Sequence, residues 1–218
     1  MLRTHQGQAN SMQGSYPGDP PKIDFTKLFK YNLRMKPYFY QFDSHLLDRH
    51  ARDSILSVAK KYADNFIDYV GINATVTDNN GILSGKYMPT YKNDISQSAH
   101  TLLDSIAIPY YPIIIRHKPN VVVPKHIDDA HNKRFCVISI PLAPINDYPP
   151  TLYWNKDDLN TPVAIAEYID HKPCLLNTEQ LHSVENTSNV DRLNFQICFG
   201  LQFETVIDLI YNKKLFKI

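Results

Sequence analysis

Cysteine is scarce in this chain, and its spacing is irregular. The 218 residues include three cysteines, Cys136, Cys174 and Cys198, and no two of them form a Cys-x-x-Cys pair. An odd number of cysteines without that spacing argues against a disulfide framework and against a structural zinc site. We therefore expect the protein to work in a reducing, cytoplasmic setting, with its cysteines as small buried hydrophobic residues.

The chain also lacks an excess of either charge. Lysine and arginine number 23, and aspartate and glutamate number 22. Such a balance gives no overall field that would draw the protein to nucleic acid or to an anionic membrane. The strongest basic stretch, Lys27 to Lys36, is modest, whereas a nucleic-acid partner calls for a concentrated basic groove with stacking aromatic residues. We do not expect nucleic acid as a partner.

Long apolar runs are missing as well. The longest stretches, such as Phe135 to Ile145, are interrupted by Ser or Pro well short of the roughly 18 residues that span a bilayer. Gln, Ser, Gly and Pro dominate residues 1–21, so we expect a flexible leader there rather than a secretory signal, and no membrane anchor. The remainder, residues 22–218, has the size and the apolar content of a single domain.

Two segments of the first half have the periodicity of amphipathic helices. Apolar residues recur at intervals of three and four from about Ser44 to Val70, with Asp43 or Ser44 as the expected N-cap, and again from Asn93 to Ile106. A helix with one apolar face needs a surface to cover. We therefore expect this helical part, about residues 44–106, to pack on a sheet.

From about residue 110 to 200 the pattern changes to short runs of β-branched and aromatic residues, separated by Pro, Asn and Asp about every ten residues. This pattern predicts a mainly β fold with flanking α-helices, in which a double-stranded β-helix, or jelly roll, is covered by the N-terminal helices. The basic segment Lys213 to Lys217 after it is a candidate mobile end. The expected strands are Tyr111 to His117, Val121 to Ile127, Arg134 to Leu142, Thr151 to Trp154, Val163 to Ile169, Cys174 to Asn177, His182 to Glu185 and Arg192 to Phe199.

A set of polar residues lies at the ends of these strands. His126 and Asp128 are two positions apart, so a strand directs both side chains to one face. Composition alone predicts about one His-x-acid match, so the pair is informative only together with His182 and Arg192, which open two later strands. Two imidazoles and one carboxylate on one face of an octahedral metal leave three positions open, as in non-haem Fe(II) oxygenases.

His126-x-Asp128, followed by His182 and Arg192, resembles the signature of the 2-oxoglutarate/Fe(II) oxygenase superfamily over about Pro112 to Phe199. The stretches Lys125 to Leu142, Leu176 to Thr178 and His182 to Asn186 are similar to the aspartyl and prolyl hydroxylase subset of that superfamily. The resemblance implies that His126, Asp128 and His182 bind Fe(II) and that Arg192 pairs with the distal carboxylate of 2-oxoglutarate. It further implies hydroxylation of a carbon centre with dioxygen as the second co-substrate and release of succinate and CO2, on an amino acid, a peptide or protein, or a small metabolite.

Two positions depart from close relatives within that superfamily. Many members have Ser or Thr two residues after the arginine, whereas this chain has Asn194, whose amide can also donate to a carboxylate, so we keep it as a co-substrate contact. Asp128 differs from the aspartyl hydroxylases at the carboxylate ligand. It also argues against a halogenase, in which the carboxylate is absent so that a halide can bind.

Each of these residues has a plainer interpretation. Asp128 and Asp129 could solvate a surface turn, with His131 as a rival ligand, and His182 could be a buried histidine bonded to a carbonyl. Arg192 could be an edge-strand cation paired with Asp191 or Glu185. These alternatives stay open at the level of sequence.

Two further residues are candidates for contact with the bound cofactor. Arg134 begins a predicted core strand, where it either points at the substrate or caps the strand in solvent. Tyr153, beside the single tryptophan Trp154, either lines the pocket or packs in the core.

A second function class competes with the oxygenase. A cupin-like jelly roll would bind metal, or nothing, without redox turnover. Cupins commonly begin with His-x-His and add a further Glu and His, whereas this chain has His-x-Asp and an arginine suited to a dicarboxylate. The pattern favours the oxygenase, and it predicts neither the substrate nor the oligomeric state.

Overall fold

The computed structural model describes residues 38–65, 77–78, 81–82, 84–87, 95–128, 134–144 and 146–217. The expected leader, residues 1–21, and the basic stretch Lys27 to Lys36 lie outside these ranges. Asp129 and His131, the rival ligands near the candidate site, also lie outside them.

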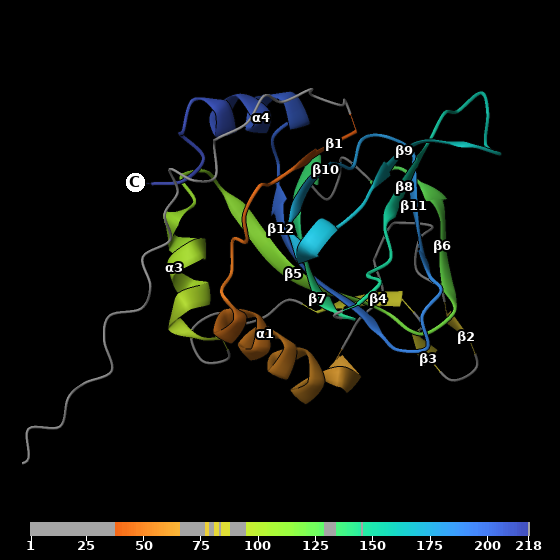
Figure 1. Cartoon of the computed structure of the whole chain (residues 1–218), viewed down its shortest axis with the longest axis horizontal. Helices are drawn as coiled ribbons and strands as arrows, with labels where there is room; N and C mark the ends of the chain where they lie inside the picture. Colours follow the sequence, from red (N-terminus) through yellow and green to blue (C-terminus); the bar gives the residue numbers. More distant parts are fainter. Residues whose placement is uncertain are drawn as a thin grey trace, which may run out of the picture.

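Two antiparallel sheets form the body of the protein (Figure 1). The larger sheet has the strand order β1-β10-β7-β12-β5-β4 and the smaller one β6-β11-β8-β9; β2 and β3 form a separate pair. From β5 onward the chain passes from one sheet to the other at nearly every connection, which is the arrangement of a jelly roll. The predicted fold class is therefore confirmed. The strands are β1 Phe39–Gln41, β2 Thr77–Asp78, β3 Gly81–Ile82, β4 Ser84–Tyr87, β5 Tyr110–His117, β6 Val121–His126, β7 Cys136–Ala143, β8 Thr151–Trp154, β9 Pro162–Ala166, β10 Cys174–Asn177, β11 His182–Asn186 and β12 Arg192–Phe199.

All eight predicted strands are present, as β5 to β12. The largest differences are at β7, which begins at Cys136 and leaves Arg134 just outside the strand, and at β9, which ends at Ala166, before a short 3-10 turn at Ile169–His171. β1 and the three short strands up to Tyr87 were not predicted, because runs of two to four residues carry too little periodicity to be recognised.

The predicted helices are present but begin later than expected. Helix α1 spans Arg49–Lys61 and is capped by Asp48, whose carboxylate accepts a hydrogen bond from the amide of Ala51 at 2.6 Å, so the N-cap predicted at Asp43 or Ser44 is wrong. Leu46 and Leu47 are buried in the segment before the helix. Because they are apolar and fit the helical spacing, the sequence pattern placed the start of the helix too early. Helix α3 spans Gln97–Ser105. The predicted residues 66–70 and 93–94 lie outside the described ranges.

The helices cover one face of the larger sheet and leave the other face to the smaller sheet (Figure 1). Strand β12 shows the consequence, because its side chains alternate between the two faces. Phe195 and Ile197 pack in the helix-side core with residues of α1, α3 and α4 (Phe203–Tyr211), whereas Cys198 lies in the core between the sheets. Arg192 and Gln196 share the inner face with Cys198. Polar residues on β12 therefore point into the space between the sheets.

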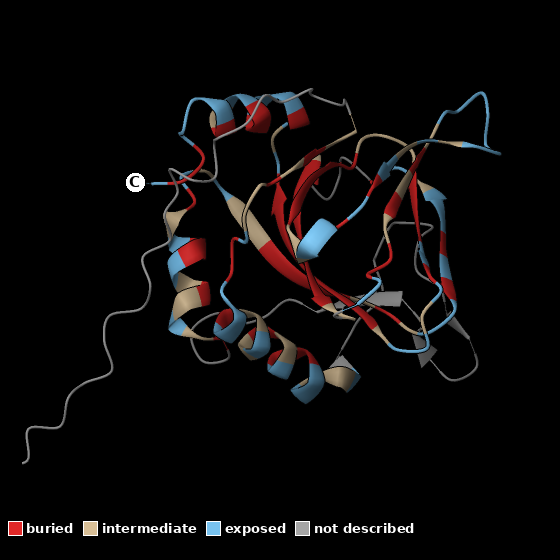
Figure 2. Cartoon of the chain, in the orientation of Figure 1, coloured by how far each residue is buried: buried red, intermediate tan, exposed pale blue. Residues whose placement is uncertain are grey.

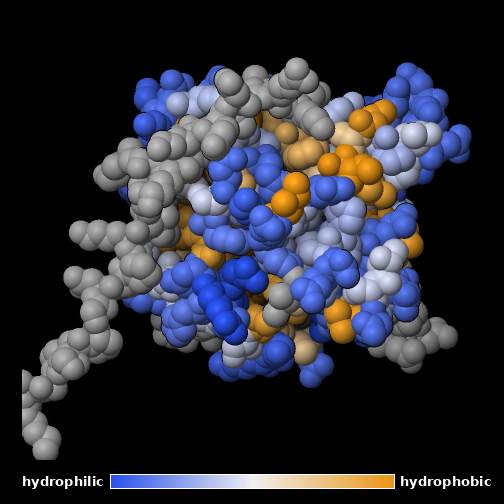
Figure 3. Space-filling model, viewed as in Figure 1, coloured by the Kyte–Doolittle hydropathy of each residue, from blue (hydrophilic) through white to orange (hydrophobic). Residues whose placement is uncertain are grey.

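Buried residues concentrate on the strands and on the helix faces turned toward them (Figure 2). The coloured part of the face seen in Figure 3 is largely hydrophilic, with smaller hydrophobic areas among the hydrophilic residues. None of the helices within the described part of the chain is long and apolar enough to cross a membrane.

The C-terminal segment belongs to the folded body, which the sequence did not predict. Helix α4, Phe203–Tyr211, buries Val206 and Ile210 in the helix-side core. After it Leu215 and Phe216 are buried, and Phe216 forms a β-bridge with Ile106. The expectation of a mobile end at Lys213 to Lys217 is therefore wrong, because the two apolar residues between the lysines insert next to α3.

Phe216→Ala should lower the free energy of unfolding by about 3 kcal/mol, because it removes a buried aromatic ring from the helix-side core. Tyr211→Ala is the matched control: it removes a ring that is 41% exposed, so we expect a loss of less than about 1 kcal/mol. Urea denaturation measures both values. Equal losses would show that the C-terminal segment does not contribute to the core.

Candidate functional site

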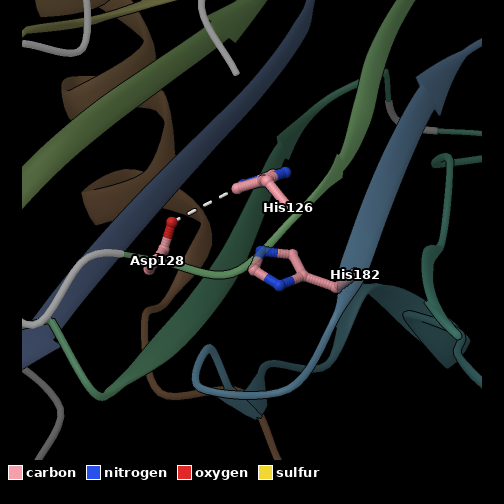
Figure 4. Close-up of side chains that lie close together, drawn as sticks. All are labelled: His126, Asp128 and His182. Atoms are coloured by element: carbon pink, nitrogen blue, oxygen red, sulfur yellow. Dashed lines mark ion pairs between the residues drawn. The ribbon is translucent and has the colours of Figure 1, made fainter. Parts of the chain in front are cut away.

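The candidate site begins with two histidines that face each other across a strand pair. His126, the last residue of β6, is the register partner of His182, the first residue of β11. Their ring centroids lie 4.3 Å apart, and Figure 4 shows both rings turned toward the same space. The antiparallel pairing of β6 with β11 therefore brings together two residues that are far apart in the sequence.

Asp128 joins the histidines from the end of β6. Its amide donates to the carbonyl of Thr178 at 3.0 Å, which holds the chain beside the turn between β10 and β11. Its Oδ1 atom lies 3.5 Å from Nε2 of His126 (dashed in Figure 4), and one ligand atom from each of the three residues lies within 4.8 Å of the others. Asp128, His126 and His182 form one cluster of potential metal ligands.

The hydrogen bonds of the two imidazoles determine which nitrogen is free. Nδ1 of His126 lies 2.8 Å from the carbonyl oxygen of Pro124, and Nδ1 of His182 lies 2.9 Å from that of Gln180. A carbonyl oxygen only accepts, so in the neutral rings Nδ1 carries the proton and Nε2 keeps its lone pair. This is the arrangement in which metal-binding histidines are oriented by a backbone carbonyl.

The charge states also suit a cation. Burial on its own would raise the pKa of Asp128, but the Arg134 guanidinium and the neighbouring histidines outweigh it and hold that pKa at about 2. Burial, with a smaller contribution from His126, lowers the pKa of His182 to about 4. At neutral pH the cluster therefore offers one carboxylate and a neutral His182.

The donor set fits a divalent metal such as Fe(II). Both carboxylate oxygens of Asp128 are buried: Oδ2 forms an ion pair with Arg134, Oδ1 faces Nε2 of His126 at 3.5 Å, and neither accepts a hydrogen bond of ordinary geometry. Leaving Oδ1 without a donor costs free energy, and an ion bound beside it would remove that cost. Two imidazole nitrogens and one carboxylate oxygen are the ligands of the facial triad.

A cavity extends from this cluster into the space between the sheets, with about 480 Å³ of empty space when its open mouth is included. Arg192 lines it and is 1% exposed. The guanidinium lies 4.7 Å from the ring centroid of Tyr148 and 6.0 Å from that of Tyr168, and its Nε donates to the carbonyl of Pro149.

Arg192 forms no ion pair with an acidic residue in the described part of the chain, where the ion pairs involve other side chains. The alternative interpretation, in which Arg192 forms an ion pair with Asp191 or Glu185, is therefore wrong. A buried guanidinium without a counter-charge is costly, and an anion in the cavity would offset that cost.

His117 is a cavity residue that the sequence did not suggest. It is the last residue of β5 and the register partner of Arg192, and it is buried. Burial first, and then the charge of Arg192, lowers its pKa well below the ordinary value. The available signal was its inward position on β5, in phase with Ile113 and Ile115, which lie in the core between the sheets.

The remaining predicted residues divide into two groups. Arg134 lines the cavity and is buried rather than capping a strand in solvent. Asn194 and Tyr153 are buried but do not line the cavity. The Asn194 amide donates to Oγ of Ser139 at 2.7 Å, and the Tyr153 ring centroid lies 6.0 Å from that of His182. In this structure both residues support the walls of the site from behind.

No protein-family model matches this sequence, and no curated protein is similar to it. Among solved structures, the chain is similar to a prolyl hydroxylase from Trichoplax adhaerens, determined in complex with a hypoxia inducible factor peptide fragment (TM-score 0.51, 10% identity, covering 75% of this chain and 83% of that one). It is also similar to a Pseudomonas putida prolyl-4-hydroxylase (TM-score 0.49, 12% identity, 74% and 91% covered) and to a 2OG-Fe(II) oxygenase family protein from Burkholderia pseudomallei (TM-score 0.45, 11% identity, 73% and 84% covered). The protein has the fold of the 2-oxoglutarate/Fe(II) oxygenases.

Asp128 should make the stability of the metal-free protein depend on pH. Its pKa is about 2 in the folded protein and 3.8 ordinarily, so its ionised form stabilises the fold above about pH 4, and this contribution is lost as the pH falls toward 2. The shift corresponds to about 2 kcal/mol. Between about pH 5 and pH 2, the free energy of unfolding should fall by about 2 kcal/mol more in the wild type than in Asp128→Asn, as measured by urea denaturation. Parallel curves would contradict this assignment.

Proposed function

We propose that the protein is an Fe(II)- and 2-oxoglutarate-dependent oxygenase that hydroxylates a carbon centre. His126, Asp128 and His182 would bind the iron, and Arg192 would bind the distal carboxylate of 2-oxoglutarate. The observation that carries the proposal is the presence, in one buried cavity, of this three-residue donor set and a guanidinium that has no acidic partner among the described residues. The fold shared with the Trichoplax enzyme supports it.

Ferrous iron with bound 2-oxoglutarate supplies the oxidising chemistry: one oxygen atom of O2 enters a C–H bond of the substrate, and the other is incorporated as the keto acid becomes succinate and CO2. The protein holds the reactants in place. Arg192 can meet a carboxylate with two parallel N–H donors, and neutral His117 beside it supplies a further ring nitrogen to the same end of the cavity. Ile115, Val123 and Val184 give the cavity apolar walls, which exclude water from the charged groups.

The substrate class is an amino acid, a peptide or protein, or a small metabolite. The peptide in the Trichoplax structure was bound to that enzyme. Proline-containing peptides are for this reason the first probes to test with this protein, followed by free amino acids, with succinate release as the readout.

Anaerobic titration of the Fe(II)-loaded protein with 2-oxoglutarate should produce the weak visible charge-transfer band of a keto acid chelated to ferrous iron. In His182→Ala the band should be lost, because the iron loses one of its two imidazole ligands. Arg116→Met on β5 serves as the control: Arg116 does not line the cavity, so we expect the band to be retained. Iron binding without a band in the wild type would instead favour a cupin-like protein without redox turnover.

Arg192→Met should weaken 2-oxoglutarate binding roughly 30-fold or more, because a buried carboxylate loses its charged partner. The 2-oxoglutarate affinity of Arg192→Lys should lie between those of the wild type and Arg192→Met, since lysine keeps the charge but not the planar pair of donors. The matched control is Arg116→Met on β5, whose guanidinium donates to the carbonyl of Ala63 on the helix side of the sheet. The same charge-transfer titration measures all four proteins, and an unchanged affinity in Arg192→Met would rule out this anchor.

A further inference from the structure

The two oxygens of the Asp128 carboxylate face different partners. Oδ1 lies 3.5 Å from Nε2 of His126, on the side of the two imidazoles. Oδ2 lies 3.1 Å from Nη1 of Arg134. Both side chains of this ion pair are almost fully buried, so solvent screens the interaction little. The carboxylate is therefore oriented by Arg134 through the oxygen that does not face His126.

Arg134 is itself held from two directions. Its Nη2 donates to Oε1 of Gln196, a buried residue of β12 that also lines the cavity. Its carbonyl accepts a hydrogen bond from Oγ1 of Thr178 at 2.7 Å, and the carbonyl of the same threonine accepts the amide of Asp128. One residue of the β10–β11 turn thus fixes the backbone on both sides of the ion pair.

We propose that Arg134 is a positioning residue for the metal centre: it holds Oδ2 of Asp128 so that the carboxylate presents the single oxygen Oδ1 to the ion, and Gln196 holds Arg134 in that position. The inference rests on the metal site proposed above. It gives Arg134 a role different from the contact with the bound cofactor that the sequence suggested.

A single-oxygen carboxylate matters for the proposed chemistry. Two imidazoles and one carboxylate oxygen leave three positions of an octahedral ion open, enough for a chelating keto acid and dioxygen. A carboxylate that bound through both oxygens would close one of them. Arginine suits the task because its planar group can face two acceptors in fixed directions: Nη1 forms the ion pair with Asp128, and Nη2 donates to Gln196.

Simple electrostatics makes the opposite prediction. A guanidinium next to a metal site repels the incoming cation, so its removal should tighten metal binding if charge is all that matters. If Arg134 positions Asp128, its removal leaves a buried carboxylate free to turn and unsatisfied on one side, and metal binding should weaken. The sign of the change separates the two roles.

The experiment is a titration of the full chain with Mn(II), in which electron paramagnetic resonance measures the free ion. Arg134→Met should weaken Mn(II) binding roughly 10- to 100-fold, the usual effect of losing a partner that orients a metal ligand. Arg134→Lys should recover part of that loss, and Gln196→Leu should weaken binding less than Arg134→Met. Arg116→Met, on the other face of the sheet, should stay within about twofold of the wild type. Circular dichroism verifies that each variant is folded.

A second comparison tests whether Arg134 acts through Asp128. Asp128→Ala and the double variant Asp128→Ala/Arg134→Met should bind Mn(II) equally weakly, because the carboxylate that Arg134 orients is absent from both. The double variant removes both charges of the ion pair and leaves neither of them buried without its partner, so it also provides a folded reference if Arg134→Met is unstable. If Arg134→Met is unstable, the Mn(II) affinities of Arg134→Lys and Gln196→Leu, both expected to be weaker than that of the wild type, test the proposal instead.

Unchanged or tighter Mn(II) binding in Arg134→Met would overturn the proposal, as would a further loss in the double variant relative to Asp128→Ala. Failure of the metal site itself has a different signature: the wild type would then bind Mn(II) no better than Asp128→Ala. That result would overturn both proposals, whereas the first two would leave the metal site intact.

Discussion

The pairing of β6 with β11 is the interaction on which the candidate site depends. It aligns His126 with His182, and because both residues lie at the end of the paired segment, the chain beyond His126 can turn and bring Asp128 to the same point. The backbone carbonyls of Pro124 and Gln180 then orient the two rings. A shift of this register by one residue would send one imidazole to the outer face of the sheet, so the pairing of β6 with its neighbour β11 determines whether the two histidines can face the same point.

The two faces of the larger sheet have different roles: one packs the hydrophobic core, and the other carries the polar residues of the candidate site. Its helix-side face packs Phe195, Ile197 and the apolar faces of three helices into one continuous core, while its inner face carries Arg192 and Gln196 toward the cavity. Burying two guanidiniums and one carboxylate between the sheets costs free energy. The helix-side core can offset that cost, and the C-terminal helix with Phe216 enlarges this core.

Features of the fold and the site that depend on neighbouring residues in the sequence could be predicted, whereas those that depend on contacts between distant parts of the chain could not. Alternation and turn residues predicted eight strands, because both are local properties of the chain. His126, Asp128, His182 and Arg192 were predicted as a set from their positions at strand ends, and the structure brings them into one cavity. His117 was missed because its inward phase on β5 only groups it with the apolar residues Ile113 and Ile115: its place beside Arg192 comes from the register of β5 with β12, another part of the chain. The later start of α1 and the packing of Leu215 and Phe216 were likewise decided by tertiary contacts.

Asn194 shows why a motif position does not settle a contact. It lies on the same strand face as Arg192, which is what the two-residue spacing predicted, yet its amide is engaged by Ser139, which in turn bonds to the hydroxyl of Tyr168. Tyr168 and Tyr148 flank the guanidinium of Arg192. These two buried rings pack against the guanidinium, and Ser139 holds one of them through its hydrogen bond to the Tyr168 hydroxyl. Asn194 is therefore linked to the surroundings of Arg192 through Ser139 and Tyr168, and its two-residue spacing from Arg192 could not predict this link because the link runs through residues of two other segments of the chain.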